Sequence, residues 1–146
     1  MFSSIVVGTD GSEAARSAVN QAIELAGELG ARLQVVSAYE PVTDPRQREM
    51  LAAPAEEWLF KARKDVLAML EEVEAQAHAA GVGDVETFAR QGDAADAILD
   101  VAEEQHCDLV IIGNRGLTGA KRFLLGSVPS KVSHHAPCSV LIVRAA

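Results

Sequence analysis

Short aliphatic runs alternate with longer segments of helical periodicity along this chain, and this alternation restricts the folds that it can adopt. The runs at 5–8 and 109–112 are continuous and flanked by turn-forming residues, which is typical of strands buried on both faces. The predicted strands are 5–8, 33–38, 85–89, 109–112 and 139–143.

Residues that commonly begin or end helices stand between these runs. Ser12 is a predicted helix N-cap, Gly30 is a predicted C-terminal stop, and Asp93 is predicted to open a later helix. Apolar residues then recur at helical spacing after each start. Two further helices are predicted at 55–81 and 127–135.

The order of these elements is that of an α/β fold. Strands that alternate with helices predict an open, doubly wound, mostly parallel sheet of five strands with helices on both faces. No linker divides the chain, so residues 1–146 are predicted to form one domain. Residues 39–54 contain three prolines and are predicted to be irregular, either as a binding lid or as a disordered loop.

Charge is unevenly distributed along the chain. The formal net charge is −8, which disfavours nonspecific binding to nucleic acid. Residues 109–146 nevertheless contain five Lys or Arg side chains and no Asp or Glu. This segment therefore either forms a local anion-binding site or is a basic tail that pairs with carboxylates elsewhere.

Neither a membrane segment nor a structural metal site is predicted. No apolar run approaches the roughly 18 residues needed to span a bilayer, and the first residues resemble a strand more than a signal peptide. We therefore expect a cytoplasmic protein. Cys107 and Cys138 are expected to be reduced thiols, because the chain has no Cys or His spacing typical of a zinc site.

A glycine-rich loop follows the predicted fourth strand, at the end of the sheet where ligands of doubly wound folds bind. Gly113 and Gly116 lack a Cβ and would let a sugar or phosphate approach the backbone, whose N–H groups bind anions. Gly126 and Ser127 precede the last predicted helix, whose first N–H groups and dipole favour a second anion site. The loop therefore predicts a phosphate-binding site.

Other well-known phosphate motifs are absent from the sequence. There is no GxxxxGK[ST] loop, and the glycines at 113–119 are spaced as GxxGxxG rather than GxGxxG. Neither a GxSxG nucleophile motif nor the protein-kinase motifs occur.

The pattern Gly113-x2-Gly116-x9-Gly126-Ser127, followed by a short helix and "SVLIV", resembles the nucleotide-binding signature of the universal stress protein (UspA) family. The opening "IVVGTDGSEAARSAVNQAIELA" and the segment "DAILDVAEEQHCDLVIIGNRG" are similar to that family as well. The resemblance covers nearly the whole chain and is weakest over residues 40–83. It implies a Rossmann-like fold of the adenine nucleotide alpha hydrolase-like type and membership of the ATP-binding branch.

The resemblance also implies a role for individual residues. Asp10 would face the ribose or adenosine part of ATP, and the backbone of Ala38 would contact the adenine edge. The loop after the fourth strand would wrap the ribose and α-phosphate, and the start of the last helix would receive the β- and γ-phosphates. The implied nucleotide-binding residues are Gly8, Thr9, Asp10, Ala38, Gly113, Asn114, Arg115, Gly116, Gly126, Ser127 and Val128.

The chain departs from the family pattern at Pro129, which follows "GSV" and has no N–H to donate. ATP, with or without Mg²⁺, is the expected ligand, and AMP or cyclic AMP are the alternatives. No catalytic residue or protein metal site is assigned, and slow ATP hydrolysis remains open beside a role as a nucleotide sensor or sink. The resemblance further implies a homodimer through Ser139–Val143, and a nucleotide-free interaction dimer is the last alternative.

Overall fold

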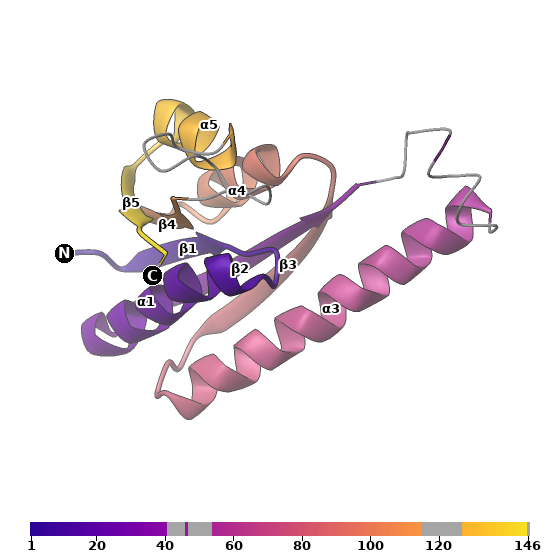
Figure 1. The fold of residues 1–146 in the computed structure, drawn as a ribbon. Coiled ribbons are helices and arrows are strands. Elements are labelled where there is room, and N and C mark those ends of the chain that lie inside the picture. The colour runs from indigo at the N-terminus through magenta and orange to yellow at the C-terminus, as the bar shows by residue number, and fades with distance from the viewer. Residues whose placement is uncertain (41–45, 47–53, 115–126, 146) are drawn as a thin grey trace.

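A computed structural model describes residues 1–40, 46, 54–114 and 127–145 of the chain (Figure 1). Strands and helices alternate in it from end to end. The elements are β1 (Ser4–Gly8), α1 (Glu13–Leu29), β2 (Arg32–Tyr39), α3 (Ala55–Ala79), β3 (Val85–Gln91), α4 (Ala94–Glu104), β4 (Leu109–Gly113), α5 (Ser127–His135) and β5 (Ser139–Val143).

The five strands form one parallel sheet in the order β3-β2-β1-β4-β5, which confirms the predicted α/β fold. From β1 the chain proceeds to β2 and β3 on one side, and then returns to place β4 and β5 on the other. The strand order therefore reverses between β1 and β4, and this is where a doubly wound sheet binds its ligands.

Two hydrophobic cores cover the two faces of the sheet. Because side chains alternate along a strand, Ile5 and Val7 of β1 pack with α1 and α3, whereas Val6 packs with α4 and α5. Figure 1 shows these two helix pairs on opposite sides of the sheet. All three side chains are fully buried.

Three predicted capping residues are confirmed. The Ser12 hydroxyl accepts a hydrogen bond from the N–H of Ala15, and Gly30 ends α1 in the left-handed conformation with φ of 64°. The Asp93 carboxylate accepts from the N–H of Asp96 at the start of α4. These residues satisfy backbone groups that a helix end leaves unpaired.

The predicted end of α3 is two residues too late, since this helix ends at Ala79 instead of 81. The predicted end of β3 is two residues too early, since this strand runs to Gln91 instead of ending at 89. Its last two residues, Arg90 and Gln91, pair with Ala38 and Tyr39 of β2. Because both side chains are polar, a prediction that recognises strands by apolar residues does not include them. Cys107 and Cys138 are free thiols, as predicted, and Cys107 is buried. No helix among the described residues is long and apolar enough to cross a membrane.

Asp108 ties the start of β4 to the start of β1. Its carboxylate accepts hydrogen bonds from the N–H groups of Ser3 and Ser4, at 2.9 and 3.0 Å, and from the Ser3 hydroxyl at 3.1 Å. Burial alone would raise the pKa of Asp108, but these hydrogen bonds outweigh it and hold the pKa below its ordinary value.

This lowered pKa predicts how stability depends on pH. A carboxyl group with a lowered folded-state pKa stabilises the fold above its unfolded pKa, and this contribution is lost as pH falls through the folded pKa. We expect the free energy of unfolding to decline between about pH 5 and about pH 3, and to decline less steeply in Asp108→Asn. Urea denaturation across this range measures both slopes, and equal slopes would contradict the role given to Asp108.

Candidate functional site

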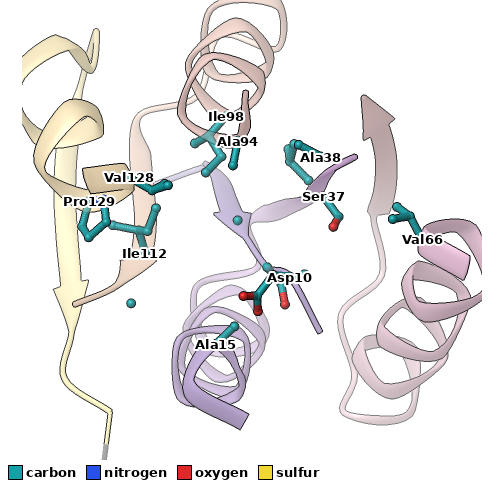
Figure 2. Close-up of a pocket in the computed structure, with 14 residues that line it drawn as sticks. Asp10, Ala15, Ser37, Ala38, Val66, Ala94, Ile98, Ile112, Val128 and Pro129 are labelled. Carbon is teal, nitrogen blue, oxygen red and sulfur yellow. The ribbon is translucent and has the colours of Figure 1, made fainter. Parts of the chain in front are cut away.

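A pocket of about 240 Å³ opens at the carboxyl end of the sheet, where β1 and β4 diverge (Figure 2). Its volume is close to the lower end of small-molecule sites, about 300 Å³. Helices α1, α4 and α5 begin beside the pocket, and α3 contributes one side wall. The lining residues are Gly8, Thr9, Asp10, Ala15, Val36, Ser37, Ala38, Val66, Ala94, Ile98, Ile112, Gly113, Val128 and Pro129.

The loop after β1 forms the floor of the pocket and is held by its own side chains. The Asp10 Oδ1 accepts the N–H of Ser12 at 2.8 Å, and the Thr9 hydroxyl accepts the N–H of Gly11 at 3.1 Å. Gly11 has φ of 80°, a conformation that favours glycine. Asp10 thus forms an Asx turn before α1 while its side chain also lines the pocket (Figure 2).

Gly8 is required by close packing rather than by its backbone angle. A Cβ at Gly8 would overlap the Ile98 side chain, with the Cγ1 atom only 2.9 Å away. Both residues line the pocket, and Ile98 is 3% exposed. A side chain at Gly8 would therefore have to displace the Ile98 side chain, which itself lines the pocket.

The backbone of Ala38 faces the pocket because β1 ends before β2 does. Pairing between the strands ends at Val36, whose C=O accepts the N–H of Thr9 at 2.9 Å. The C=O of Tyr39 accepts the N–H of Gly92 on the opposite, β3 side at 2.9 Å. Since a parallel strand presents its backbone groups to its two neighbours alternately, Ala38 presents both of its groups toward the side where β1 has ended. They have no backbone partner among the described residues.

The starts of α4 and α5 form the opposite wall of the pocket. Ala94, Ile98, Val128 and Pro129 line it, and their side chains are apolar (Figure 2). Pro129 is buried in the first turn of α5 and carries no N–H. This wall thus offers apolar contact, with one donor fewer than an ordinary helix start.

Lys131 joins these two helices instead of facing the pocket. Its Nζ lies 2.8 Å from the Asp96 carboxylate and 3.3 Å from that of Asp93, both on α4 or its cap. The Asp96 carboxylate, followed by that of Asp93, raises the pKa of Lys131. The pKa of Asp93 is lowered, chiefly by the hydrogen bond from the Asp96 N–H and further by Lys131. Lys131 therefore pairs with carboxylates elsewhere in the chain, which is one of the two alternatives given above for the basic segment, and does not contribute to an anion site here.

The structure brings together six of the eleven residues implied by the resemblance. Those that line the pocket are Gly8, Thr9, Asp10, Ala38, Gly113 and Val128. Asn114 and Ser127 are not among the lining residues, although each is next in sequence to one of them, and the Asn114 Oδ1 accepts the N–H of Ala145 at 3.0 Å. Arg115, Gly116 and Gly126 lie outside the described residues.

Sequence reasoning missed several residues of the pocket. Ser37 and Val36 precede Ala38 and could have been found from the strand end alone. Val66 belongs to α3, and no local signal distinguishes it from the other apolar residues of that helix. Its place in the wall depends on how α3 packs on the sheet.

The described part of the pocket offers little to a metal ion. Asp10 is the sole carboxylate among the lining residues, and the described chain holds no group of three or more His, Cys, Asp or Glu side chains suited to a metal. Mg²⁺ commonly binds through one or two carboxylates and the phosphates of its nucleotide. Asp10 is thus the one described residue that could approach such an ion.

Comparison with known proteins identifies the family. The model of the universal stress protein family matches residues 1–144. The chain belongs to this family. It is 37% identical over 144 residues to the universal stress protein Rv1636 of Mycobacterium tuberculosis, covering 98% of this chain and 97% of that one. It is 41% identical over 145 residues to a universal stress protein of Thermus aquaticus, covering 99% and 100%.

A solved structure extends the likeness to the fold. The crystal structure of a universal stress protein in complex with cAMP is 32% identical to this chain, with a TM-score of 0.76, and the match covers 99% of this chain and 98% of that one. The resemblance read from the glycine-serine pattern is therefore confirmed at the level of family and fold.

Proposed function

We propose that this universal stress protein binds an adenine nucleotide in the pocket between β1 and β4. The observation that carries the proposal is the backbone of Ala38, which has no backbone partner in the described part of the chain and presents an N–H and a C=O on the same side at the pocket wall. Adenine carries an amino donor beside a ring nitrogen acceptor, so its edge is complementary to this pair. The apolar side chains of Ile98 and Val128 would then contact the base and sugar.

The phosphates would lie toward Gly113 and the start of α5. The helix dipole and the first N–H groups of α5 favour an anion there. ATP is the ligand that the glycine-serine pattern favours, with Mg²⁺ held chiefly by its phosphates.

The second candidate ligand is a monophosphate, either AMP or cyclic AMP. Pro129 lines the pocket and lacks an N–H, so one donor for a longer phosphate chain is missing. A family member 32% identical to this chain crystallises in complex with cAMP, and this supports the same candidate.

The proposed role is that of a cytoplasmic stress-response nucleotide sensor or sink, carried by one domain over residues 1–146, with slow ATP hydrolysis as the alternative. Hydrolysis requires a positioned water and usually a metal beside the transferred phosphate. Asp10 is the only described carboxylate at the pocket, and it lies beside the ribose in this arrangement.

Titration calorimetry with ATP, AMP, cyclic AMP and GMP tests the proposal. We expect binding of at least one adenine nucleotide, weaker binding of GMP, and a raised melting temperature with the bound ligand. Absence of heat and of melting shift with all three adenine nucleotides would exclude the proposed function. Phosphate release from ATP that disappears in Asp10→Ala, with binding retained, would instead favour a slow ATPase.

We also propose a homodimer formed through β5, which is an edge strand of the sheet. The C=O of Val143 accepts the N–H of Asn114 on the β4 side, so the backbone groups of Val140 and Ile142 face the free edge. An unpaired aliphatic edge favours pairing with a twofold-related copy. Leu141, at 38% exposure, adds an apolar side chain to this edge.

Leu141→Lys is expected to shift the protein from dimer to monomer, because a charged side chain on an edge strand opposes pairing. Sedimentation velocity of both proteins measures the change. The matched control is Leu67→Lys on α3, a similarly exposed leucine at 43%, which should leave the dimer intact. A monomeric native protein, or a dimer unaffected by Leu141→Lys, would contradict this interface.

A further inference from the structure

Ser37 is a buried serine whose hydroxyl has no hydrogen-bond partner among the described residues. Its side chain is 3% exposed, and it lines the pocket at the end of β2. In the described part of the chain, no side-chain nitrogen or oxygen that is sealed from solvent lacks a partner. The Ser37 hydroxyl therefore is not sealed in the core but opens into the pocket.

The other two buried polar residues of the described chain behave differently. Ser4 and Gln34 lie at the opposite end of the sheet, where the Gln34 side-chain amide donates to the Ser4 hydroxyl at 3.3 Å and to the Ile5 C=O at 2.7 Å. The Ser4 hydroxyl in turn donates to the Cys107 sulfur at 3.6 Å. Buried polar groups are normally satisfied in this way, so an unpartnered hydroxyl at a pocket indicates a contact that a ligand completes.

The position of Ser37 indicates which part of a nucleotide it contacts. It precedes Ala38, and successive side chains of a strand point to opposite faces. Figure 2 shows the Ser37 oxygen on the side of Asp10 and Val66, whereas the Ala38 side chain points toward Ala94 and Ile98. A base whose edge meets the Ala38 backbone would thus lie close to the Ser37 hydroxyl.

We infer that the Ser37 hydroxyl donates a hydrogen bond to a ring nitrogen of the adenine base that the Ala38 backbone leaves uncontacted. This inference rests on the proposed function. With the amino group and N1 of adenine meeting the Ala38 backbone, the ring acceptors left are N3 and N7. A serine hydroxyl supplies the matching donor. Ser37 would therefore help to bind the purine ring, and it would not distinguish adenine from guanine, which carries the same ring acceptors.

The test measures the affinity of AMP, 3-deaza-AMP and 7-deaza-AMP for the native protein, Ser37→Ala and Ser37→Cys by titration calorimetry. We expect Ser37→Ala and Ser37→Cys to bind AMP about ten-fold more weakly, the loss of one hydrogen bond. One of the two deaza analogues should bind the native protein about ten-fold more weakly than AMP, and this penalty should vanish in both variants.

Ser133→Ala provides the matched control, because Ser133 is an exposed serine whose hydroxyl donates to the Ser130 C=O on α5. It should bind all three ligands as the native protein does. Equal AMP affinity of folded Ser37→Ala and native protein would overturn the inference, and so would a deaza penalty that persists in the variants. Native protein that is indifferent to both analogues would overturn it without any variant. These results leave the proposed function standing, whereas native protein that binds no adenine nucleotide removes both.

Discussion

Gly8→Val is expected to weaken binding of the adenine nucleotide by at least about 100-fold, which corresponds to about 2.7 kcal/mol. A Cβ at Gly8 would overlap the buried Ile98 side chain, and both residues line the pocket, so the added side chain or the displaced Ile98 would occupy pocket volume. The variant would therefore fill the site from within. Overpacking of this kind also costs about 1–3 kcal/mol of stability, so the fold should survive.

Calorimetric titration of Gly8→Val, with circular dichroism to verify the fold, measures this effect. Gly83→Val is the control, because a Cβ at Gly83 meets nothing within 4 Å and its φ is not in the positive range. It should bind as tightly as the native protein. Unchanged affinity in folded Gly8→Val would show that the nucleotide binds elsewhere.

Leu33→Ala is expected to lower the free energy of unfolding by about 2–5 kcal/mol. Leu33 is 0% exposed, and it lies in β2 within the core shared with α1 and α3. Because β2 is paired on both sides, the backbone around the deleted side chain cannot readily collapse into the cavity. The loss would be a large fraction of the about 5–15 kcal/mol that stabilises an ordinary domain.

Urea denaturation of Leu33→Ala and Leu67→Ala compares the same substitution in two environments. Leu67 is 43% exposed on α3, so its truncation should change the free energy of unfolding by no more than about 0.5 kcal/mol. Similar losses in the two variants would mean that β2 does not lie in the core.

Much of the fold was predictable because its strands are buried on both faces and its helices carry clear caps. The predicted bounds of α5 and β5 agree with the structure, as do the caps at Ser12, Gly30 and Asp93. At β3 the prediction was two residues short, because the polar residues there are strand only through their pairing with β2.

The pocket was predictable only in part. The strand end and the glycine spacing point to Gly113 from local sequence, since the carboxyl ends of parallel strands meet at one edge. Gly8 and Asp10 were implied by the family resemblance. The contributions of Val66 and of Ile98 are set by helix packing, which no local pattern reports.

By itself, the sequence determined the class of fold, the family and the edge of the sheet where a ligand would bind, because hydrophobic period, capping residues and glycine spacing are local properties. Only the tertiary structure decided that, among the residues it describes, the Ala38 backbone and the Ser37 hydroxyl lack a partner and Lys131 pairs with α4. Each of these depends on which residues distant in the chain become neighbours, and folding alone decides that.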